Sequence, residues 1–307
     1  MLEVRVSAPD SKLANLAILK ITQFHINAGD HVSWYMPLFD TNIDKLYVSK
    51  IFTFTDDLLY LPNCEIVKGG TGYDLTTVLP DEIESITDIS LAYELLYPTI
   101  DYSIIFTTRG CVRHCPFCVV PEKEGLTHSV PIVSSNPNGR YIELLDNNFF
   151  SGRSWESRLD YLRCLDQPIN FNTGIDVRTL TEEQAEMLGR CNIKAIHIAW
   201  DNLDEEESVR RGIERLIKYV SPSLITCYVL IGFEQPNIID SDFYRIEELH
   251  KYKITPFAMG YIDFSNSKQK RSDEVKHFQR WVNKHLFKTI KWLDYRPMKP
   301  IFDFIEG

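Results

Sequence analysis

The chain has 307 residues, of which 44% are hydrophobic and 25% charged, a composition typical of a soluble globular protein. Its formal net charge of −10 at pH 7 argues against a surface that coats nucleic acid throughout. The seven cysteines are dispersed, no signal peptide is evident and no run of about 18 apolar residues occurs. We therefore expect a cytoplasmic protein of about two domains, without disulfides or a membrane span.

Residues 1–95 alternate strand and helix patterns, which predicts a small α/β domain with a parallel sheet. Four strands are predicted at residues 2–6, 31–35, 45–49 and 65–68. Apolar residues recur at helical spacing over residues 13–28, and Gly29 is a suitable helix end. The domain resembles a reduced Rossmann domain of the cobalamin-binding type. However, it lacks the Asp-x-His-x-x-Gly pattern that supplies a cobalt ligand in part of that family.

A glycine-rich segment follows the fourth predicted strand, Lys68-Gly-Gly-Thr-Gly-Tyr-Asp74. Ligands collect at the carboxyl ends of parallel strands, so Gly70 and Tyr73 are candidate substrate contacts. A tight connection between domains is an equally good interpretation. Residues 80–98, which contain prolines and acidic residues, are predicted to be a linker.

The second domain, residues 96–265, repeats a strand and helix rhythm. The predicted strands are 102–107, 140–145, 169–173, 195–200, 224–231 and 257–262. The predicted helices are 154–166, 182–191, 204–219 and 240–252. Thr181 is a good helix cap, with acidic residues in the first turn after it.

Three cysteines lie in one short loop after the first of these strands, Cys111-Val-Arg-His-Cys115-Pro-Phe-Cys118. Three thiolates can hold three irons of a [4Fe–4S] cubane and leave the fourth iron open for chemistry. A zinc site or a reactive cysteine cluster is the alternative. Zinc requires a fourth ligand, and His114 lies awkwardly between two of the cysteines.

The stretch from Arg109 to Pro121 resembles the cluster loop of the radical S-adenosylmethionine (radical SAM) superfamily. It is most similar to the branch with methylthiotransferases and enzymes that carry a cobalamin-binding domain. The resemblance implies a partial (β/α)6 TIM-like barrel and a [4Fe–4S] cluster on Cys111, Cys115 and Cys118. It also implies SAM bound at the open iron and cleaved reductively to a 5′-deoxyadenosyl radical.

The resemblance places the remaining SAM contacts at the mouth of the barrel. Phe117 would shield the cluster near the adenine. The other expected SAM contacts are Asp146, Asn147, Asn148, Asp176, Arg178, Asp201, Ile231 and Gly232. Alternation along an extended strand would place Gly174, Asp176 and Arg178 on one face.

Each of these residues also has a structural interpretation. The Asp-Asn-Asn run suits an asparagine turn, and Asp176 with Arg178 suits a salt bridge. His197 is a candidate substrate contact, but a lone histidine on a strand is more often a hydrogen-bonded core residue.

The last segment, residues 266–307, is basic and aromatic. Ten lysines and arginines fall between Lys268 and Lys299, against three acidic residues. Helical spacing from Val275 to Ile290 predicts an amphipathic helix packed on the core. The basic face is also a possible patch for an anionic substrate or nucleic acid.

Four functions remain open at this point. The first is a radical SAM enzyme that abstracts hydrogen from a small-molecule or nucleotide-like substrate, with an external electron donor such as flavodoxin or ferredoxin. The second is a cobalamin-dependent radical SAM methyltransferase, although no motif supports cobalamin. Methylthiotransfer would require three further cysteines in the first domain, where only Cys64 occurs. The last is a metal- or nucleic-acid-binding module without enzymatic activity.

Overall fold

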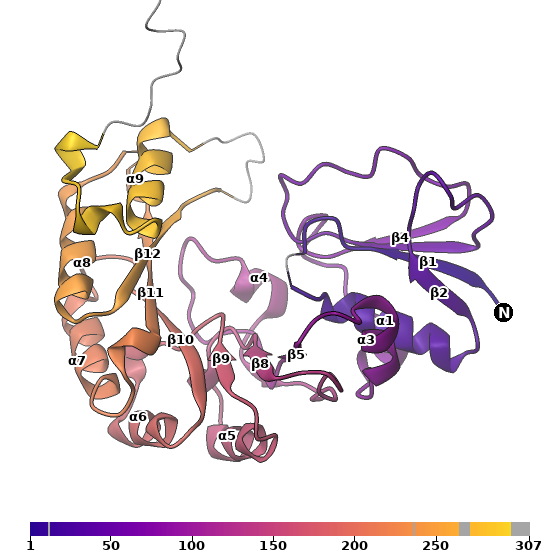
Figure 1. Ribbon diagram of the computed structural model, residues 1–307, viewed down its shortest axis with the longest axis horizontal. Coiled ribbons are helices and arrows are strands. Elements are labelled where there is room, and N and C mark those ends of the chain that lie inside the picture. The colour runs from indigo at the N-terminus through magenta and orange to yellow at the C-terminus, as the bar shows by residue number, and fades with distance from the viewer. Residues whose placement is uncertain (12, 236, 264–270, 296–307) are drawn as a thin grey trace, which may run out of the picture. The chain divides into compact units, whose positions relative to one another are not determined.

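The computed structural model describes residues 1–11, 13–235, 237–263 and 271–295. The chain forms two compact units (Figure 1). Unit 1 contains residues 1–174 and 191–194, and unit 2 contains residues 175–190 and 195–307. The domain boundaries expected near residues 95 and 265 remain predictions.

A parallel four-stranded sheet forms the N-terminal part of unit 1. Its strands are β1 (Glu3–Ser7), β2 (His31–Trp34), β3 (Lys45–Ser49) and β4 (Glu65–Gly69). They lie in the order β2-β1-β3-β4, with Val4 opposite Val32 and Val6 opposite Tyr47. All four predicted strands and their parallel arrangement are confirmed.

Helix α1 (Leu16–Asn27) covers this sheet with an apolar face. Ile18 and Ile21 pack in one core cluster with Val4 and Val6 of β1. The helix begins where the Asn15 side chain accepts the Ile18 backbone N–H at 3.2 Å. It ends before Gly29, whose φ of +78° is the left-handed conformation expected at a helix end.

The prediction that residues 80–98 form a linker is wrong, because this segment folds into α2 (Asp81–Glu84) and α3 (Ser90–Leu96). Helix α3 lies beside α1 (Figure 1). Tyr93 is 1% exposed, and its hydroxyl accepts the Ile104 backbone N–H at 2.9 Å. The prolines and acidic residues of this segment suggested a linker, but Ile89, Ala92 and Leu96 form an apolar face that is buried in the core.

The rest of unit 1 carries three parallel strands, β5 (Tyr102–Ile105), β8 (Tyr141–Leu144) and β9 (Ile169–Phe171). Helix α5 (Trp155–Cys164) lies between β8 and β9 in the sequence. Between β5 and β8 a short antiparallel pair forms from β6 (Thr108–Arg109) and β7 (His128–Ser129), with helix α4 (Val120–Glu124) inside the loop it closes. The sequence did not predict this pair.

Unit 2 repeats strand and helix as predicted. Strand β10 (Ile193–Ala199) begins in unit 1 and pairs in parallel with β11 (Ile225–Ile231), which pairs with β12 (Thr255–Gly260). Its helices are α6 (Glu182–Gly189), α7 (Glu206–Leu216), α8 (Asp240–Lys251) and α9 (Asp273–Asn283). Thr181 caps α6 in a reciprocal capping box with Gln184, which confirms its predicted role.

The strand order of the second sheet is β12-β11-β10-β9-β8-β5, so β12 and β5 are its edges. Parallel strands linked by helices confirm the α/β class, but the described strands do not form a closed barrel. None of the described helices is both long and apolar enough to cross a membrane.

Two details of unit 2 differ from the predictions. Residues 174–178 do not extend β9, because Val177–Thr179 forms a 3₁₀ turn that Asp176 caps by accepting the Arg178 N–H at 3.2 Å. The predicted alternation of Gly174, Asp176 and Arg178 therefore does not apply. Helix α9 ends at Asn283 rather than near Ile290, and it buries Val275, Phe278, Trp281 and Val282 as an amphipathic helix should. The basic residues Lys268, Lys270, Arg296 and Lys299 lie outside the described residues.

We expect Tyr93→Phe to lower the free energy of unfolding by about 1 kcal/mol, because the buried Ile104 N–H loses its acceptor. Tyr93→Ala should cost about 3–5 kcal/mol, since it also leaves a cavity in the core. Urea denaturation measures both changes. Tyr60→Phe is the control, because Tyr60 is 65% exposed. Equal effects of the Phe and Ala variants would contradict the expected packing role.

Candidate functional site

The three cysteines of the predicted cluster lie in one closed loop of unit 1. The antiparallel pair of β6 and β7 joins Thr108 to Ser129 and Arg109 to His128, so it closes the loop at its base. The backbone N–H of Cys118 donates to the Cys115 carbonyl at 3.0 Å, which turns the chain tightly between these two thiols. The loop starts just after the carboxyl end of β5, as the sequence predicted.

Gly110 fixes the direction in which the chain enters the loop. Its φ is +78°, and a Cβ atom there would lie 2.5 Å from the carbonyl oxygen of Leu126. The neighbouring Cys111 N–H donates to the Gly125 carbonyl at 3.1 Å. Only glycine combines this conformation with so close an approach of two backbone segments.

Glu124, the last residue of α4, ties the loop together through its carboxylate. It accepts the Gly110 N–H at 2.8 Å and the Asn147 side-chain amide at 2.5 Å. It also forms an ion pair with Arg109 at 2.8 Å. One side chain therefore connects both ends of the cysteine loop to the segment after β8.

Asp146 ties the end of β8 to the start of the loop. Its carboxylate accepts the Thr107 N–H at 2.6 Å and the hydroxyls of Thr107 and Thr108 at 2.5 and 2.7 Å. The residue is 1% exposed. Burial raises the pKa of its carboxyl above the ordinary value, although these hydrogen bonds act in the opposite direction. Asp146 thus holds the loop in place, and its carboxylate is already engaged by protein donors.

The exposure and hydrogen bonds of the three cysteine thiols suit ligands of a cluster. None of the three is in a disulfide, and Cys111 and Cys115 are half-buried, Cys118 exposed and Phe117 half-buried between them. The Sγ of Cys111 accepts the Arg113 N–H at 3.4 Å and faces the Asn148 amide nitrogen at 4.0 Å. Hydrogen bonds to cluster sulfurs of this kind tune reduction potential.

Within residues 1–11, 13–235, 237–263 and 271–295, no three His, Cys, Asp or Glu side chains converge as ligands of one metal ion. A cubane cluster sets a different requirement, because each of its irons takes a single thiolate. Three thiols at separate positions along one loop fit that requirement. Cys111, Cys115 and Cys118 are therefore the residues that could hold such a cluster.

Unit 2 gathers charged groups at the carboxyl ends of β10 and β11. Arg245 of α8 is 3% exposed and donates to the carbonyls of Trp200, Asp201 and Leu230 at 2.8, 2.6 and 3.1 Å. It also pairs with Asp242 at 2.5 Å. This arginine satisfies the carbonyls at the strand ends. A small cavity of about 10 Å³, lined in part by Asp201 and Arg245, lies beside it.

Asp201 follows β10 and has a strongly perturbed carboxyl. Burial raises its pKa to about 6, against the opposing effects of Arg178 and Arg245. Arg178 does not pair with Asp201. It binds Asp176 at 2.6 Å and also Glu205. The predicted pair of Asp176 and Arg178 exists, and both partners belong to unit 2.

The other predicted residues of unit 2 lie on two faces of its strands. Ile231 is 1% exposed, on the face of β11 that is buried with Val229, so its side chain is directed into the core. Gly232 follows with a φ of +74°. His197 is half-buried on the opposite, alternating face of β10 and stacks on Tyr228 with ring centroids 5.1 Å apart. Ala195 and Ala199 share that face, as the sequence predicted.

The glycine-rich segment after β4 packs on the end of β3. Gly70 has a φ of +96°, and a Cβ atom there would lie 2.3 Å from the Lys50 carbonyl oxygen. The Lys50 ammonium lies 4.3 Å from the centroid of the Tyr73 ring. Burial and nearby Asp57 raise the pKa of Tyr73 to about 12. A close connection accounts for these glycines, and a substrate role for Gly70 and Tyr73 stays a prediction.

Sequence reasoning missed the residues that hold the site together. Glu124 and Arg245 are among them, together with the hydroxyls of Thr107 and Thr108. The sequence offered one clue, because Glu124 is a carboxylate shortly after the last cysteine of the loop. Their partners are far apart in the chain, so pairing became apparent only in the structure.

No protein-family model matches the chain. Among curated proteins, a segment of 88 residues is 28% identical to the ribosomal protein uS12 methylthiotransferase RimO of Lachnoclostridium phytofermentans. The match covers 25% of this chain, and the chain spans only about a fifth (20%) of that protein's length. This local similarity agrees with the resemblance of the cysteine loop to the branch that contains methylthiotransferases, and it supports a relationship to the radical SAM enzymes.

Glu124→Ala should loosen the cysteine loop, because the Gly110 N–H and the Arg109 guanidinium lose their common acceptor. We expect amide hydrogen exchange at Gly110 and Cys111 to accelerate by about 10-fold or more, as loss of a hydrogen bond to a charged group would cause. Mass-spectrometric exchange measures this rate. Glu122→Ala, an exposed neighbour on α4, is the control and should leave the rate unchanged. An unchanged rate in Glu124→Ala would contradict this account.

The raised pKa of Asp201 predicts a pH dependence of stability. A carboxyl with a higher pKa in the folded than in the unfolded state binds its proton more tightly when folded, so it destabilises the fold as pH rises from about 4 to 6. Asp201→Asn should remove this loss and gain up to about 3 kcal/mol relative to wild type between pH 4 and 7. Urea denaturation across this range measures the difference, with the exposed Asp204→Asn as control. A pH-independent difference would refute the assignment.

Proposed function

We propose that the chain is a radical SAM enzyme whose [4Fe–4S] cluster is held by Cys111, Cys115 and Cys118. The observation that carries this proposal is the closed loop at the carboxyl end of β5, which carries three cysteines outside any disulfide. When bound, such a cluster supplies the electron that cleaves SAM into methionine and a 5′-deoxyadenosyl radical, which abstracts hydrogen from a substrate. The alternation of six parallel strands with helices supports a partial (β/α)6 barrel around this chemistry.

In this proposal the protein's own groups position the loop. Glu124 and Asp146 hold the loop, and the Cys111 Sγ accepts the Arg113 backbone N–H. Asn147 donates to Glu124, and we propose that its remaining amide groups contact SAM. We propose Asn148, Asp176, Arg178, Asp201 and Gly232 as the remaining polar or close-approach contacts to SAM.

The substrate is proposed to be a small molecule or nucleotide, with an external flavodoxin or ferredoxin as electron donor. A role of the C-terminal basic segment in binding nucleic acid is also a proposal. Four of its basic residues lie outside the described part of the chain. Cobalamin in the N-terminal domain remains an alternative cofactor without a supporting contact.

A second candidate function is methylthiotransfer, and the local similarity to the uS12 methylthiotransferase favours it. The cysteine content opposes it, because residues 1–95 contain Cys64 alone, whereas the resemblance requires three cysteines there for a second cluster. Cys64 is half-buried, and its thiol donates to the Glu65 carbonyl at 3.4 Å. We therefore place this activity second.

Anaerobic reconstitution with iron and sulfide tests the cluster. We expect about four irons per chain, and formation of 5′-deoxyadenosine from SAM under dithionite. Cys111→Ala, Cys115→Ala and Cys118→Ala should each reduce 5′-deoxyadenosine formation by at least about 100-fold, because an outer-shell change alone costs roughly 10–100-fold.

Cys164→Ala is the matched control, since Cys164 is an exposed thiol outside the loop. It should keep both iron content and SAM cleavage. A chain that binds about one metal ion and does not cleave SAM would favour the non-enzymatic binding module over this proposal.

A further inference from the structure

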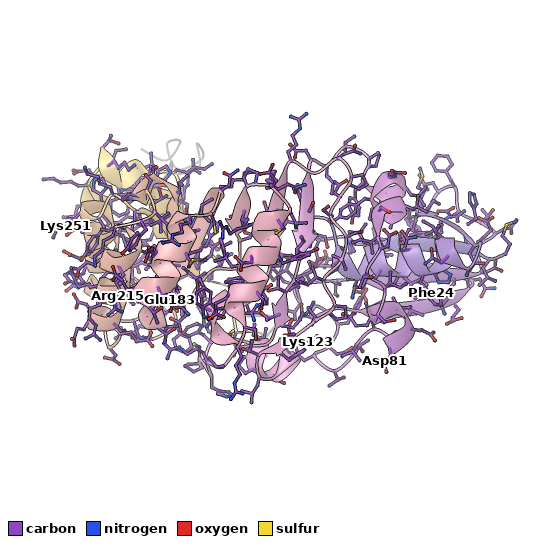
Figure 2. The ribbon with its side chains drawn as sticks, turned by 90° about the horizontal axis from the view of Figure 1, so that it is seen from below. Phe24, Asp81, Lys123, Glu183, Arg215 and Lys251 are labelled. Atoms are coloured by element: carbon purple, nitrogen blue, oxygen red, sulfur yellow. The ribbon has the colours of Figure 1, made fainter. Side chains whose placement is uncertain are left out.

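Unit 1 contains a cavity of about 790 Å³, which Arg109, Glu124 and His128 line but none of the cysteines does. Its floor is the face of β3 and β4 that carries Tyr47 and Val67. One wall is α1, with Ile21 and Phe24, and another is the segment around Leu79. Figure 2 labels two of the lining residues, Phe24 on α1 and Lys123 on α4.

The cavity exists because two of the three connections between the strands of this sheet contain no helix. In a doubly wound fold each connection between parallel strands carries a helix, and helices cover both faces. Here residues 35–44 and 50–64 connect β2 to β3 and β3 to β4 without any helix. Helix α1 covers β1, while the same face of β3 and β4 is left open beside it.

Its size and lining match those of sites for small organic molecules. Such sites occupy roughly 300–1,000 Å³ and combine mostly apolar walls with a few fixed polar groups. The apolar part of the lining includes Ile18, Ile21, Phe24, Val67, Leu79 and Ile83. A ligand with an apolar body would replace water against these side chains.

Among the lysines and arginines that line the cavity, one has no carboxylate partner within the described part of the chain. Lys20, Lys45 and Arg109 pair with Glu84, Glu65 and Glu124 at 2.8–2.9 Å. Lys68 lies 3.3 Å from Asp57.

Lys123 differs from the other lining cations. Within the described residues, its ammonium donates only to two carbonyls, those of Thr77 at 2.9 Å and Asp74 at 3.3 Å. The turn that supplies these carbonyls is itself fixed. The carboxylate of Asp74 accepts the backbone N–H groups of Thr76 and Thr77 at 2.7 and 2.5 Å. Glu82, the remaining lining carboxylate, is exposed, whereas Lys123 is half-buried. Lys123 is therefore an anchored positive charge with one donor position to spare.

The usual ligand position of such a sheet is already filled by the protein. In the order β2-β1-β3-β4, the crevice lies at the carboxyl ends of β1 and β3. There the Asp10 carboxylate accepts the N–H groups of Ile51 and Phe52 at 3.0 and 2.8 Å, and the Thr55 hydroxyl at 2.9 Å. An external anion would have to displace this carboxylate, so the open face beside α1 is the better site.

We propose that this cavity binds an organic anion, an aromatic or acyl phosphate or carboxylate, with its apolar body on β3 and β4. Its anionic group bonds to the Lys123 ammonium. Binding at this site does not require an iron–sulfur cluster. Failure of this proposal would therefore leave the function proposed above unaffected, and the reverse is also true.

Isothermal titration of the full chain with 2-naphthyl phosphate and with uncharged 2-naphthol tests the proposal. We expect the phosphate to bind at least about 10-fold more tightly, because a charge-assisted hydrogen bond adds to the same apolar contacts. Lys123→Met should remove this preference and leave the affinity for 2-naphthol unchanged. Lys123→Arg should retain it.

Two further variants control for effects on folding. Val78→Trp adds bulk at a lining residue that is 77% exposed, and it should lower the affinity for both probes. Lys276→Met removes an exposed lysine of α9 in unit 2 and should change neither affinity. The melting temperature of each variant without probe shows whether it is folded. Two results would overturn the proposal. One is no binding of 2-naphthyl phosphate at about 5 mM, and the other is a Lys123→Met variant that still binds 2-naphthyl phosphate more tightly than 2-naphthol.

Discussion

The buried carboxylate of Asp146 is the interaction on which the candidate site depends. Its hydrogen bonds to Thr107 and Thr108 join the end of β8 to the chain that leaves β5. A buried charge is costly unless several donors satisfy it, and here a backbone N–H and two hydroxyls do so. The position of the first residues of the cysteine loop follows from this bond. Glu124 then sets the path of the remainder by linking Gly110 to Asn147.

In both units, charged side chains satisfy backbone groups near the ends of strands, with carboxylates in unit 1 and a guanidinium in unit 2. Strands that end together leave backbone groups without partners in the sheet, and buried groups of this kind must be satisfied. In unit 1, carboxylates accept N–H groups where the chain turns away from the sheet. In unit 2, the Arg245 guanidinium donates to three carbonyls at the ends of β10 and β11. The polar residues near the strand ends therefore serve the backbone first, whatever ligand they also contact.

The sequence was sufficient for features encoded locally and insufficient for those set by distant partners. Periodicity predicted the strands β1 to β4, and Thr181 predicted the start of α6, because neighbouring residues determine both. The segment 80–98 was misjudged, since the burial of Tyr93 depends on Ile104 and on α1. Asp176 was expected on an extended strand, but its carboxylate captures the Arg178 N–H and begins a turn. The cysteine spacing identified the candidate ligands, while Glu124 became evident only through its contacts.

The closure of the cysteine loop by β6 and β7 has a consequence for how the protein is assembled. In small zinc domains the metal supplies the free energy that folds the chain, so removing the metal unfolds it. Here the loop between Arg109 and His128 is held by a backbone ladder, a carboxylate and a glycine turn, all made by the polypeptide. The path of this loop is therefore set by contacts that need no metal ion. Of the three thiols in the loop, Cys118 is the exposed one, whereas Cys111 and Cys115 are half-buried.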